Sequence, residues 1–403
     1  MRKRLLLCSI ACPPKNGPES LQVGKYIQGL LNTGEFNIDV FTSSSPTLFM
    51  PEDKSLNKYL DGVGNIYTKP INENKYLNFM KRKVGSSNIF RPDSKYSFYK
   101  YDDSKLFNSI EKPDVIYSRS FPISSTLEAF KLQDYFNVPW VLHLSDPWSW
   151  SPIHYLNEKN AAWNKEWERK CFEKASLITL TSLQTIAHYS RVYPEFKKKF
   201  FYCPNVLESV AIGEIERKEI NKCHFVYTGG LVGKRTLKPF FDAISLLNSD
   251  ELEQVSVTIA GPMDRANRAL LKQYKNLNIN YQGTLSYNEA KALQLKSDIL
   301  IVVDNEVSTP EDAVFFPSKV LDYFITQKKI LAITTPGSCT ESVLSDQDIV
   351  IYRNQTEQIL ETLKKLVMIK PKEVNRSKEL MLYNNLYQGK LLVNKIKHLL
   401  NEI

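Results

Sequence analysis

The feature that most limits how this chain can fold is a regular alternation of short apolar runs with longer amphipathic segments. The apolar runs are about four to eight residues long and rich in Val, Ile, Leu and Phe, which is typical of parallel strands buried on both faces. The amphipathic segments between them are typical of helices that cover such a sheet. The alternation therefore predicts an α/β protein built on parallel sheets.

Two such series follow one another, and we expect one doubly wound, Rossmann-like domain from each. The first series has predicted strands at 4–11, 38–42, 115–118, 140–144, 177–181 and 200–203, and predicted helices at 19–31, 124–135, 160–174 and 183–192. The second has predicted strands at 224–227, 255–260, 279–282, 299–303, 330–333 and 349–352, and predicted helices at 236–247, 265–274, 287–295 and 317–325.

The length of 403 residues is more than one hydrophobic core normally serves, which also favours two domains. We expect the first domain at 1–207 and the second at 222–375, joined by a polar, glycine-containing linker at 208–221. The last segment, 376–403, is predicted to be a helix that packs back on the first domain.

The net charge of +9, from 53 basic against 44 acidic residues, suits an anionic partner. Nucleic acid, a membrane surface and a phosphorylated substrate all fit that sign. The basic residues are spread along the chain and form no nucleic-acid-binding signature, so we expect no nucleic-acid partner.

The six cysteines form no C-x-x-C pair and have no histidines at metal-site spacing, so we expect no metal site and a reducing cytoplasm. The apolar run at the N-terminus is short for a signal peptide and leads into a Pro/Gly loop, which favours a buried first strand. No apolar stretch reaches the roughly 18 residues of a membrane span. We therefore expect a cytoplasmic protein.

The segment 67–107 interrupts the alternation and interleaves basic with aromatic residues. A long irregular stretch inside a compact domain is usually functional. Two interpretations stay open: a solvated insertion that contains a helix, or a surface that meets a lipid headgroup or an anionic acceptor. The second would add peripheral contact with the inner face of the membrane.

The strongest local motif is FVYTGGLVGKRTLKPFFDAI at 225–244. A strand leads into Gly229 and Gly230, which let the backbone approach a ligand, and a helix is predicted from about 236. Arg235 and Lys238 supply positive charge that can hold a diphosphate. A plain strand–turn–helix with solvated cations is the alternative. Cations at a helix N-terminus are unfavourable without an anion, which favours an anion site.

A second motif follows the predicted strand 299–303. Pro317 is expected at the first helical position, with Ser318 and Lys319 at the helix start. Asp322 lies one turn further, where a carboxylate can accept hydrogen bonds from both hydroxyls of a ribose. The alternative is that Asp322 only complements the helix dipole and that Lys319 is solvated.

The order YTGG-x4-R, TIAGP, YQGTLSYNEA and FFPSKVLDYF-x5-ILAITTPGS resembles the donor-binding domain of GT-B-fold glycosyltransferases, particularly the retaining glycosyltransferase family 4. The first half agrees through PPKNGPES, KPDVIYSR, PWVLHLSDPW and FFYCPNV. The resemblance covers nearly the whole chain in order, and it implies the GT-B fold of two Rossmann-like domains facing a cleft.

The resemblance also implies roles for the donor site. Arg235 and Lys238 correspond to the basic pair on the donor diphosphate, and Asp322 to the second acid of the E-x7-E motif, the ribose ligand. The loop from Gly283 to Leu285 corresponds to the one that flanks the base. Gly17 corresponds to the glycine loop near the donor phosphates.

His143 and Asp146 stand at the end of a predicted strand, where many relatives carry a histidine or aspartate near the reacting sugar and the acceptor. A core histidine is the alternative for His143. The first acid of E-x7-E is missing, because Val314 occupies its position. Glu311 or Asp312 in a shifted loop is the expected substitute.

The resemblance therefore implies a glycosyltransferase. It would move a sugar from a nucleoside-diphosphate sugar to a hydroxyl acceptor with retention, in cell-surface polysaccharide or glycolipid synthesis. The donor is a substrate, and the acceptor a glycan or lipid-linked molecule. Neither a cofactor nor a metal is expected, and a metal held by the loop acids Asp304, Glu306, Glu311 and Asp312 is the weaker alternative. A nucleotide-sugar epimerase of the same fold and an inactive glycosyltransferase-like partner subunit are the alternatives.

Overall fold

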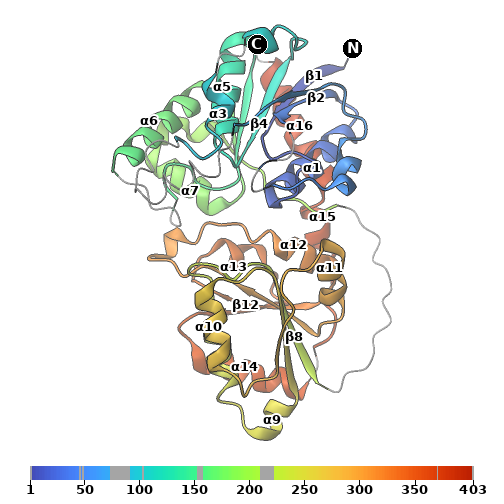
Figure 1. Ribbon diagram of the computed structural model, residues 1–403, viewed down its shortest axis with the longest axis vertical. Coiled ribbons are helices and arrows are strands. Elements are labelled where there is room, and N and C mark those ends of the chain that lie inside the picture. The colour runs from blue at the N-terminus through green and yellow to red at the C-terminus, as the bar shows by residue number, and fades with distance from the viewer. Residues whose placement is uncertain are drawn as a thin grey trace. The chain divides into compact units, whose positions relative to one another are not determined.

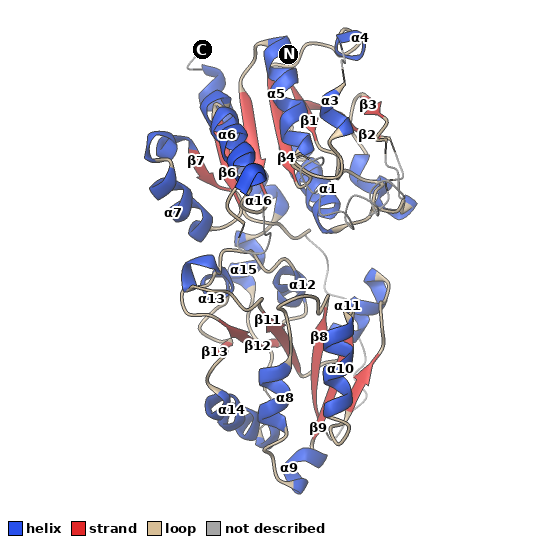
Figure 2. Ribbon diagram, turned by 60° about the vertical axis from the view of Figure 1, so that its left-hand side comes forward, coloured by secondary structure: helices blue, strands red, loops and turns tan. Residues whose placement is uncertain are grey.

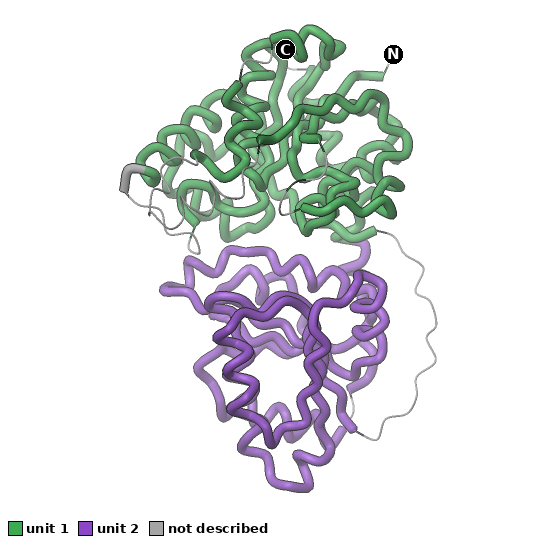
Figure 3. The backbone as a smooth tube through the Cα atoms, in the orientation of Figure 1, with its two compact units in different colours: residues 1–208, 382–403 green, residues 209–381 purple. Residues whose placement is uncertain are grey.

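The computed structural model describes residues 2–44, 47, 50–72, 91–101, 104–151, 158–208, 222–369 and 371–401. The chain forms two compact units (Figure 3). Unit 1 consists of Met1–Glu208 and Leu382–Ile403, and unit 2 of Ser209–Met381. Each unit is a parallel sheet between helices (Figures 1 and 2).

Unit 1 has a seven-stranded parallel sheet in the order β3-β2-β1-β4-β5-β6-β7. Its strands are β1 (Lys3–Cys8), β2 (Phe36–Ser43), β3 (Ile66–Lys69), β4 (Val115–Ser120), β5 (Trp140–Leu144), β6 (Leu177–Leu180) and β7 (Phe200–Tyr202). Its helices are α1 (Pro18–Leu31), α3 (Ser97–Lys100), α4 (Ser104–Phe107), α5 (Ser124–Phe136), α6 (Glu158–Lys174), α7 (Leu183–Val192) and α16 (Asn385–Asn401), with 3-10 helices η1 (Lys54–Leu60) and η3 (Pro194–Lys199).

The central strand β1 is apolar throughout its second half because both of its faces are covered. Leu5 and Leu7 pack into the apolar cluster that also contains residues of α1 and α16. Leu6 and Cys8 point the other way, into the cluster with residues of α5 and α6. Alternation of side chains across a strand with two covered faces explains the continuous apolar run.

The two ends of the chain meet in unit 1, where α16 packs on α1 (Figure 1). Two glycines allow the helices to approach closely, since a Cβ on Gly389 would lie 2.8 Å from the carbonyl carbon of Gly29. The predicted single helix at 376–403 is divided, with α15 (Ser377–Leu382) ending before α16. Leu207 bonds to the backbone of Tyr383 and Asn385 at the break.

Unit 2 has a six-stranded parallel sheet in the order β10-β9-β8-β11-β12-β13. Its strands are β8 (Cys223–Thr228), β9 (Val255–Ala260), β10 (Ile279–Tyr281), β11 (Ile299–Val303), β12 (Lys329–Thr334) and β13 (Ile349–Tyr352). Its helices are α8 (Lys238–Ile244), α9 (Ser249–Glu253), α10 (Arg265–Gln273), α11 (Tyr287–Leu295), α12 (Lys319–Ile325), α13 (Cys339–Val343) and α14 (Thr356–Met368), with the 3-10 helix η4 (Pro310–Asp312).

The predicted fold class is confirmed, since both sheets are parallel and both reverse their strand order once. The reversals lie between β1 and β4 in unit 1 and between β8 and β11 in unit 2. All predicted strands are present, but β3 was missed. It is a short edge strand with polar residues and a half-exposed Ile66, so it lacks the apolar run of a buried strand.

The basic and aromatic segment at 67–107 lies partly outside the described residues, at 73–90 and 102–103. In its described part, one face of α3 is buried, while Lys100 at its end is exposed. Phe98 is fully buried, with its ring centroid 5.7 Å from that of Phe41. Within the described ranges, no helix is long and apolar enough to cross a membrane.

Candidate functional site

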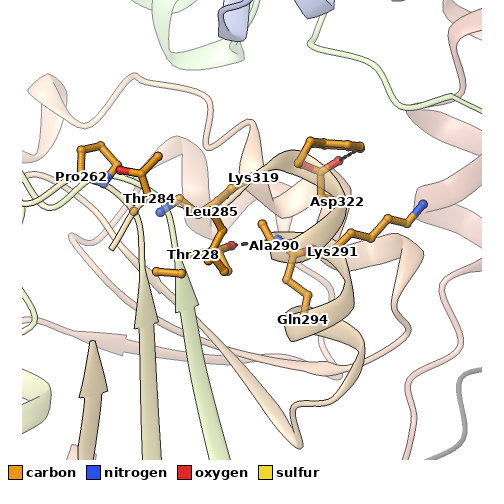
Figure 4. A pocket seen from close by; sticks show the side chains of 13 residues that line it. Thr228, Pro262, Thr284, Leu285, Ala290, Lys291, Gln294, Lys319 and Asp322 are labelled. Carbon is orange, nitrogen blue, oxygen red and sulfur yellow. Dashed lines mark hydrogen bonds between the residues drawn. The ribbon is translucent and has the colours of Figure 1, made fainter. Parts of the chain in front are cut away.

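The carboxyl edge of the unit 2 sheet contains a pocket of about 250 Å³ (Figure 4). Its walls come from the ends of β8 and β9, the loop after β10, and helices α11 and α12. The lining residues are Thr228, Gly229, Ala260, Gly261, Pro262, Thr284, Leu285, Tyr287, Ala290, Lys291, Gln294, Lys319 and Asp322. Ligands of open α/β sheets bind at this edge, beside a reversal of strand order.

Two glycines let the backbone segments that form the pocket floor cross closely. Gly229 and Gly261 have φ of 126° and 135°, a conformation that side chains rarely allow. A Cβ on Gly261 would lie 2.2 Å from the carbonyl oxygen of Gly229. A Cβ on Gly229 would lie 2.7 Å from Nζ of Lys319, so the glycine makes room for that amine.

Lys319 is the first residue of α12, and its amine is buried in the pocket wall. Nζ lies 3.9 Å from the centroid of the Tyr227 ring and has no hydrogen-bond partner within the described residues. Burial lowers the pKa of Lys319 well below its usual value, and Arg235 adds to this while Asp304 opposes it. A buried amine with no protein partner is a costly arrangement that an anionic ligand would relieve.

Asp322 stands three residues after Lys319, so both side chains emerge on one side of α12 (Figure 4). Oδ1 of Asp322 accepts a hydrogen bond of 3.1 Å from the hydroxyl of Tyr287, the first residue of α11. The pocket thus carries a buried cationic group at one place and a half-buried carboxylate at another. That combination fits a ligand with an anionic end and a hydroxylated end.

Gln294 is a pocket residue that the sequence analysis missed. It is 5% exposed, and its amide Nε2 donates to Oγ1 of Thr228 at 2.8 Å. Its Oε1 is buried without a partner among the described residues. Gln294 lies inside a helical segment with no motif around it, so no sequence signal marked it.

Arg235 follows β8 and lies beside the pocket rather than in its lining. Its backbone pairs with Asn305, and its Nε is buried without a hydrogen-bond partner within the described ranges. Burial raises the pKa of Asp304 above its usual value. The hydrogen bonds from Thr334 and Thr340 and the charges of Arg235 and Lys319 oppose this rise. The structure therefore brings Arg235, Lys319 and Asp304 together.

Lys238 is oriented along its own helix. Its Nζ lies 2.6 Å from Oδ2 of Asp242, one turn later in α8, and its side chain is 56% exposed. This is a solvent-exposed ion pair of the kind that stabilises a helix modestly. The structure does not bring Lys238 to the pocket.

Some of the other predicted residues of unit 2 line the pocket and others do not. Leu285 lines the pocket, and Gly283 stands just before it with φ of 71°. The carbonyl of Gly230 accepts a bond from Tyr227 at the pocket floor. The prediction that the helix of the second motif begins at Pro317 is wrong. The helix α12 begins at Lys319, Ser318 is its N-cap, and Pro317 lies in the preceding loop.

The loop before α12 departs most from the E-x7-E pattern. Val314 is 1% exposed and belongs to the interior. Glu311 is exposed on η4, and Asp312 caps the same 3-10 helix through the backbone N–H of Thr309. The acid that the structure brings near the cations is Asp304, at the end of β11.

Unit 1 places His143 in its interior. It lies on β5 and is fully buried, with Nδ1 2.9 Å from Oγ1 of Thr179. Burial lowers the pKa of His143 well below 6.5, and Arg119 adds to this. Its Nε2 is buried without a hydrogen-bond partner among the described residues, so only one ring nitrogen is satisfied, and His143 stays a candidate from the sequence.

A buried ion pair, missed from the sequence, occupies the carboxyl edge of the unit 1 sheet. Arg119 on β4 is fully buried, and its Nε lies 3.2 Å from Oε1 of Glu19, in the first turn of α1. Ser145, just after β5, donates to Oε2 of Glu19 at 2.6 Å. Burial raises the pKa of Glu19 to about 7 although Arg119 and Ser145 lower it.

Asp146 and Gly17 lie beside this ion pair. Asp146 is half-buried, and its charge adds to the rise in the pKa of Glu19. Gly17 is the N-cap of α1 in an extended conformation. In the part of the chain that the structure describes, no group of three His, Cys, Asp or Glu side chains is placed to hold a metal ion.

Neither a protein-family model nor a curated protein sequence matches this chain. Solved structures match it over nearly its whole length. HepE from Anabaena, in complex with UDP and glucose, is 11% identical with a TM-score of 0.62 over 98% of this chain and 100% of that one. Sucrose-phosphate synthase from Thermosynechococcus elongatus is 12% identical with a TM-score of 0.63 over 100% of both chains.

The lipopolysaccharide outer core galactosyltransferase WaaB, in its apo form, is 14% identical with a TM-score of 0.59 over 99% of both chains. Likenesses of this kind establish the fold. This chain has the two-domain α/β fold of these proteins, which is the GT-B fold expected from its sequence.

Proposed function

We propose that this protein is a glycosyltransferase that takes its sugar from a nucleoside-diphosphate sugar bound in the pocket of unit 2. The observation that carries the proposal is the amine of Lys319, buried without a protein partner beside Gly229 and three residues before the carboxylate of Asp322. An anionic diphosphate would supply the missing partner of the amine. A ribose would supply hydroxyl donors to the carboxylate.

The donor would run along the pocket in a definite order. The diphosphate lies at Gly229 and Lys319, the ribose at Asp322, and the base against the loop that contains Thr284 and Leu285. Solved proteins of the same fold include complexes with UDP and with UDP-glucose, which supports a nucleotide-sugar donor. The donor is a substrate, and the proposal requires no cofactor or metal.

Catalysis in this proposal rests on stabilising the departing diphosphate. The bond between the anomeric carbon and the phosphate oxygen breaks, while the acceptor oxygen bonds to that carbon with retention and its hydroxyl releases a proton. Preorganised cations contribute most where charge develops on a leaving group. The position of Lys319 in the pocket wall, with Arg235 beside it, supports this part of the proposal.

Unit 1 would bind the acceptor, a glycan or lipid-linked hydroxyl compound, with Asp146 at the carboxyl edge of its sheet. A role in cell-surface polysaccharide or glycolipid synthesis follows from that acceptor class. It places the protein in the cytoplasm with peripheral contact to the inner face of the membrane. Incubating the protein with sugar nucleotides and no acceptor separates this activity from epimerisation, which needs no second substrate.

The direct test is nucleotide binding by thermal shift, with UDP, GDP, ADP and dTDP and their sugars. A ligand at 100 times its dissociation constant stabilises the folded protein by about 2.7 kcal/mol. We expect one nucleotide class to raise the melting temperature, and Asp322→Asn to reduce that shift with the fold intact.

The matched control is Asp242→Asn, the same change on α8 of unit 2, whose residues do not line the pocket. It should leave the nucleotide shift as in the wild type. Absence of any nucleotide shift, or full binding by Asp322→Asn, would contradict the proposal.

A further inference from the structure

Tyr287 connects two helices of unit 2 at the rim of the pocket. It is the first residue of α11, and its hydroxyl donates to Oδ1 of Asp322 on α12 at 3.1 Å. Both residues line the pocket although they are 35 positions apart in sequence. The ring itself is 53% exposed. A ring at the pocket rim whose hydroxyl is bound to a carboxylate restricts the orientation of that carboxylate.

Both ends of this hydrogen bond are attached to firmly held backbone. Ser286, the N-cap of α11, accepts a bond from the N–H of Glu289, and Glu289 accepts one from the N–H of Ser286 at 2.8 Å. Such a reciprocal capping box fixes the first turn of a helix, and with it the start of the Tyr287 side chain. On the other helix, Asp322 stands between two buried residues, Leu321 and Tyr323.

The bond to Tyr287 leaves most of the carboxylate available. An ionised carboxylate has about four positions that accept hydrogen bonds, and Tyr287 occupies one of them on Oδ1. The two adjacent hydroxyls of a ribose need two more. The hydroxyl of Tyr287 can therefore stay in place while a ribose binds, and it holds Asp322 in one orientation meanwhile.

We infer that Tyr287 is a positioning residue that sets Asp322 to receive both ribose hydroxyls, so that the site selects ribonucleoside over 2′-deoxyribonucleoside diphosphates. The inference rests on the proposed function and adds a sugar specificity to it. A deoxyribose offers only one hydroxyl to a carboxylate prepared for two. Once the bound nucleotide covers the carboxylate, one of its acceptor positions lacks a donor, which weakens binding.

Loss of the Tyr287 hydroxyl should relax this selection. A carboxylate that can rotate loses part of its preorganisation for the ribose, and it can turn toward the single remaining hydroxyl of a deoxyribose or toward water. The variant Tyr287→Phe keeps the ring and removes only the hydroxyl. Its effect therefore falls on the ratio of the two affinities more than on the fold.

The experiment is calorimetric titration of the full chain with UDP, GDP, ADP and CDP and with their 2′-deoxy forms. For the nucleotide that binds, we expect the wild type to prefer the ribo form by about 30-fold, the size of one hydrogen bond to a charged group. In Tyr287→Phe the preference should fall to about 5-fold, mainly through weaker binding of the ribo form.

The matched control is Tyr274→Phe, which removes another tyrosine–aspartate bond of unit 2, the one from Tyr274 to Asp242 outside the pocket. This control should keep the wild-type preference. A general structural effect of losing a surface tyrosine hydroxyl would instead appear in both variants, as a change in melting temperature without a change in the ratio.

Three outcomes overturn the inference while the proposed function stands. These are equal binding of ribo and deoxy forms by the wild type, an unchanged preference in Tyr287→Phe, and tighter binding of both forms by that variant. The last would mean that Tyr287 competes with the ribose for Asp322. Failure of every nucleotide to bind the wild type would remove the proposed function, and this inference with it.

Discussion

The carboxyl edges of the two sheets both contain a buried basic side chain, but within the described residues only the one in unit 1 forms an ion pair. In unit 1, Arg119 is bound to Glu19 and to the hydroxyl of Tyr117. In unit 2, Nζ of Lys319 lies against the Tyr227 ring with no hydrogen-bond partner in the described residues. The first edge is internally neutralised, whereas the second presents its cation to a pocket.

The difference indicates what each edge contributes. A buried ion pair holds the segments that it connects, here the start of α1 and the end of β4, and has little left to offer a ligand. A buried amine without a hydrogen-bond partner costs stability, and an anionic ligand would recover that cost. The proposed role of Lys319 therefore rests on its missing hydrogen bond, whereas the partners of Arg119 indicate a structural role.

The largest expected effect comes from Arg119→Met, which removes the ion pair between Arg119 and Glu19. Glu19 would be left buried with only Ser145 as a partner, and removal of one member of such a pair costs about 3 kcal/mol or more. The free energy of unfolding of unit 1, measured by chemical denaturation, should fall by that amount. Nucleotide affinity at unit 2 should stay unchanged.

The companion variant Glu19→Gln leaves the fully buried Arg119 without a counterion, and its amide oxygen can accept only one of the two bonds that Arg119 and Ser145 donate to Glu19, so its cost should be similar. Equal stability of Arg119→Met and the wild type would show that the pair is not structural. A loss of nucleotide affinity in Arg119→Met without a loss of stability would contradict the conclusion that Arg119 stabilises unit 1 and does not contribute to nucleotide binding.

The second largest effect is expected at the carboxyl edge of the unit 2 sheet, where Lys319 lines the pocket. Lys319→Met replaces the buried amine by an apolar side chain of similar length, so folding stability should stay the same or rise. Affinity for a nucleoside diphosphate sugar should fall by about 30-fold, the size of one charge-assisted hydrogen bond. The matched control is Lys238→Met, an exposed lysine that is paired with Asp242. An equal loss of affinity in both variants would argue for a general charge effect.

The two edges also differ in how much of them the sequence could predict. Gly229, Lys319 and Asp322 lie in short local motifs at a strand end and a helix start, so the sequence identified these three pocket residues, but it did not identify Gly261. The pair of Glu19 and Arg119 joins residues 100 positions apart. Tyr287 and Asp322 are 35 apart, and no local pattern links them.

Local sequence also could not predict where the side chains of Lys238 and Val314 lie. Spacing placed Lys238 one turn from a helix start, but it could not tell a ligand-binding lysine from one that pairs along its own helix with Asp242. A count of eight residues back from Asp322 reached Val314, which folding places in the interior. Strands and fold class are predicted by periodicity, whereas side-chain partners depend on tertiary packing.

The smallest expected effect is the pH dependence of donor binding in the pocket of unit 2. In the free protein the pKa of Lys319 lies well below its usual value because of burial and of Arg235. A bound diphosphate favours the protonated amine, so above the free-state pKa binding takes up a proton. Affinity should therefore be highest at lower pH and fall as pH rises, by at most about tenfold per pH unit for one proton.

Calorimetry with a nucleoside diphosphate sugar in buffers of different ionisation enthalpy measures this proton directly, because the donor phosphates themselves do not titrate near neutral pH. The charged groups around Lys319 are Arg235 and Asp304, with Tyr227 beneath the amine. Burial raises the pKa of Asp304 and the pKa of Tyr227, so the variant Lys319→Met is needed to separate the amine from these two neighbours. Lys319→Met should bind weakly and without proton uptake. If proton uptake persisted in that variant, the proton would belong to another group, and the assignment of the proton to Lys319 would be wrong.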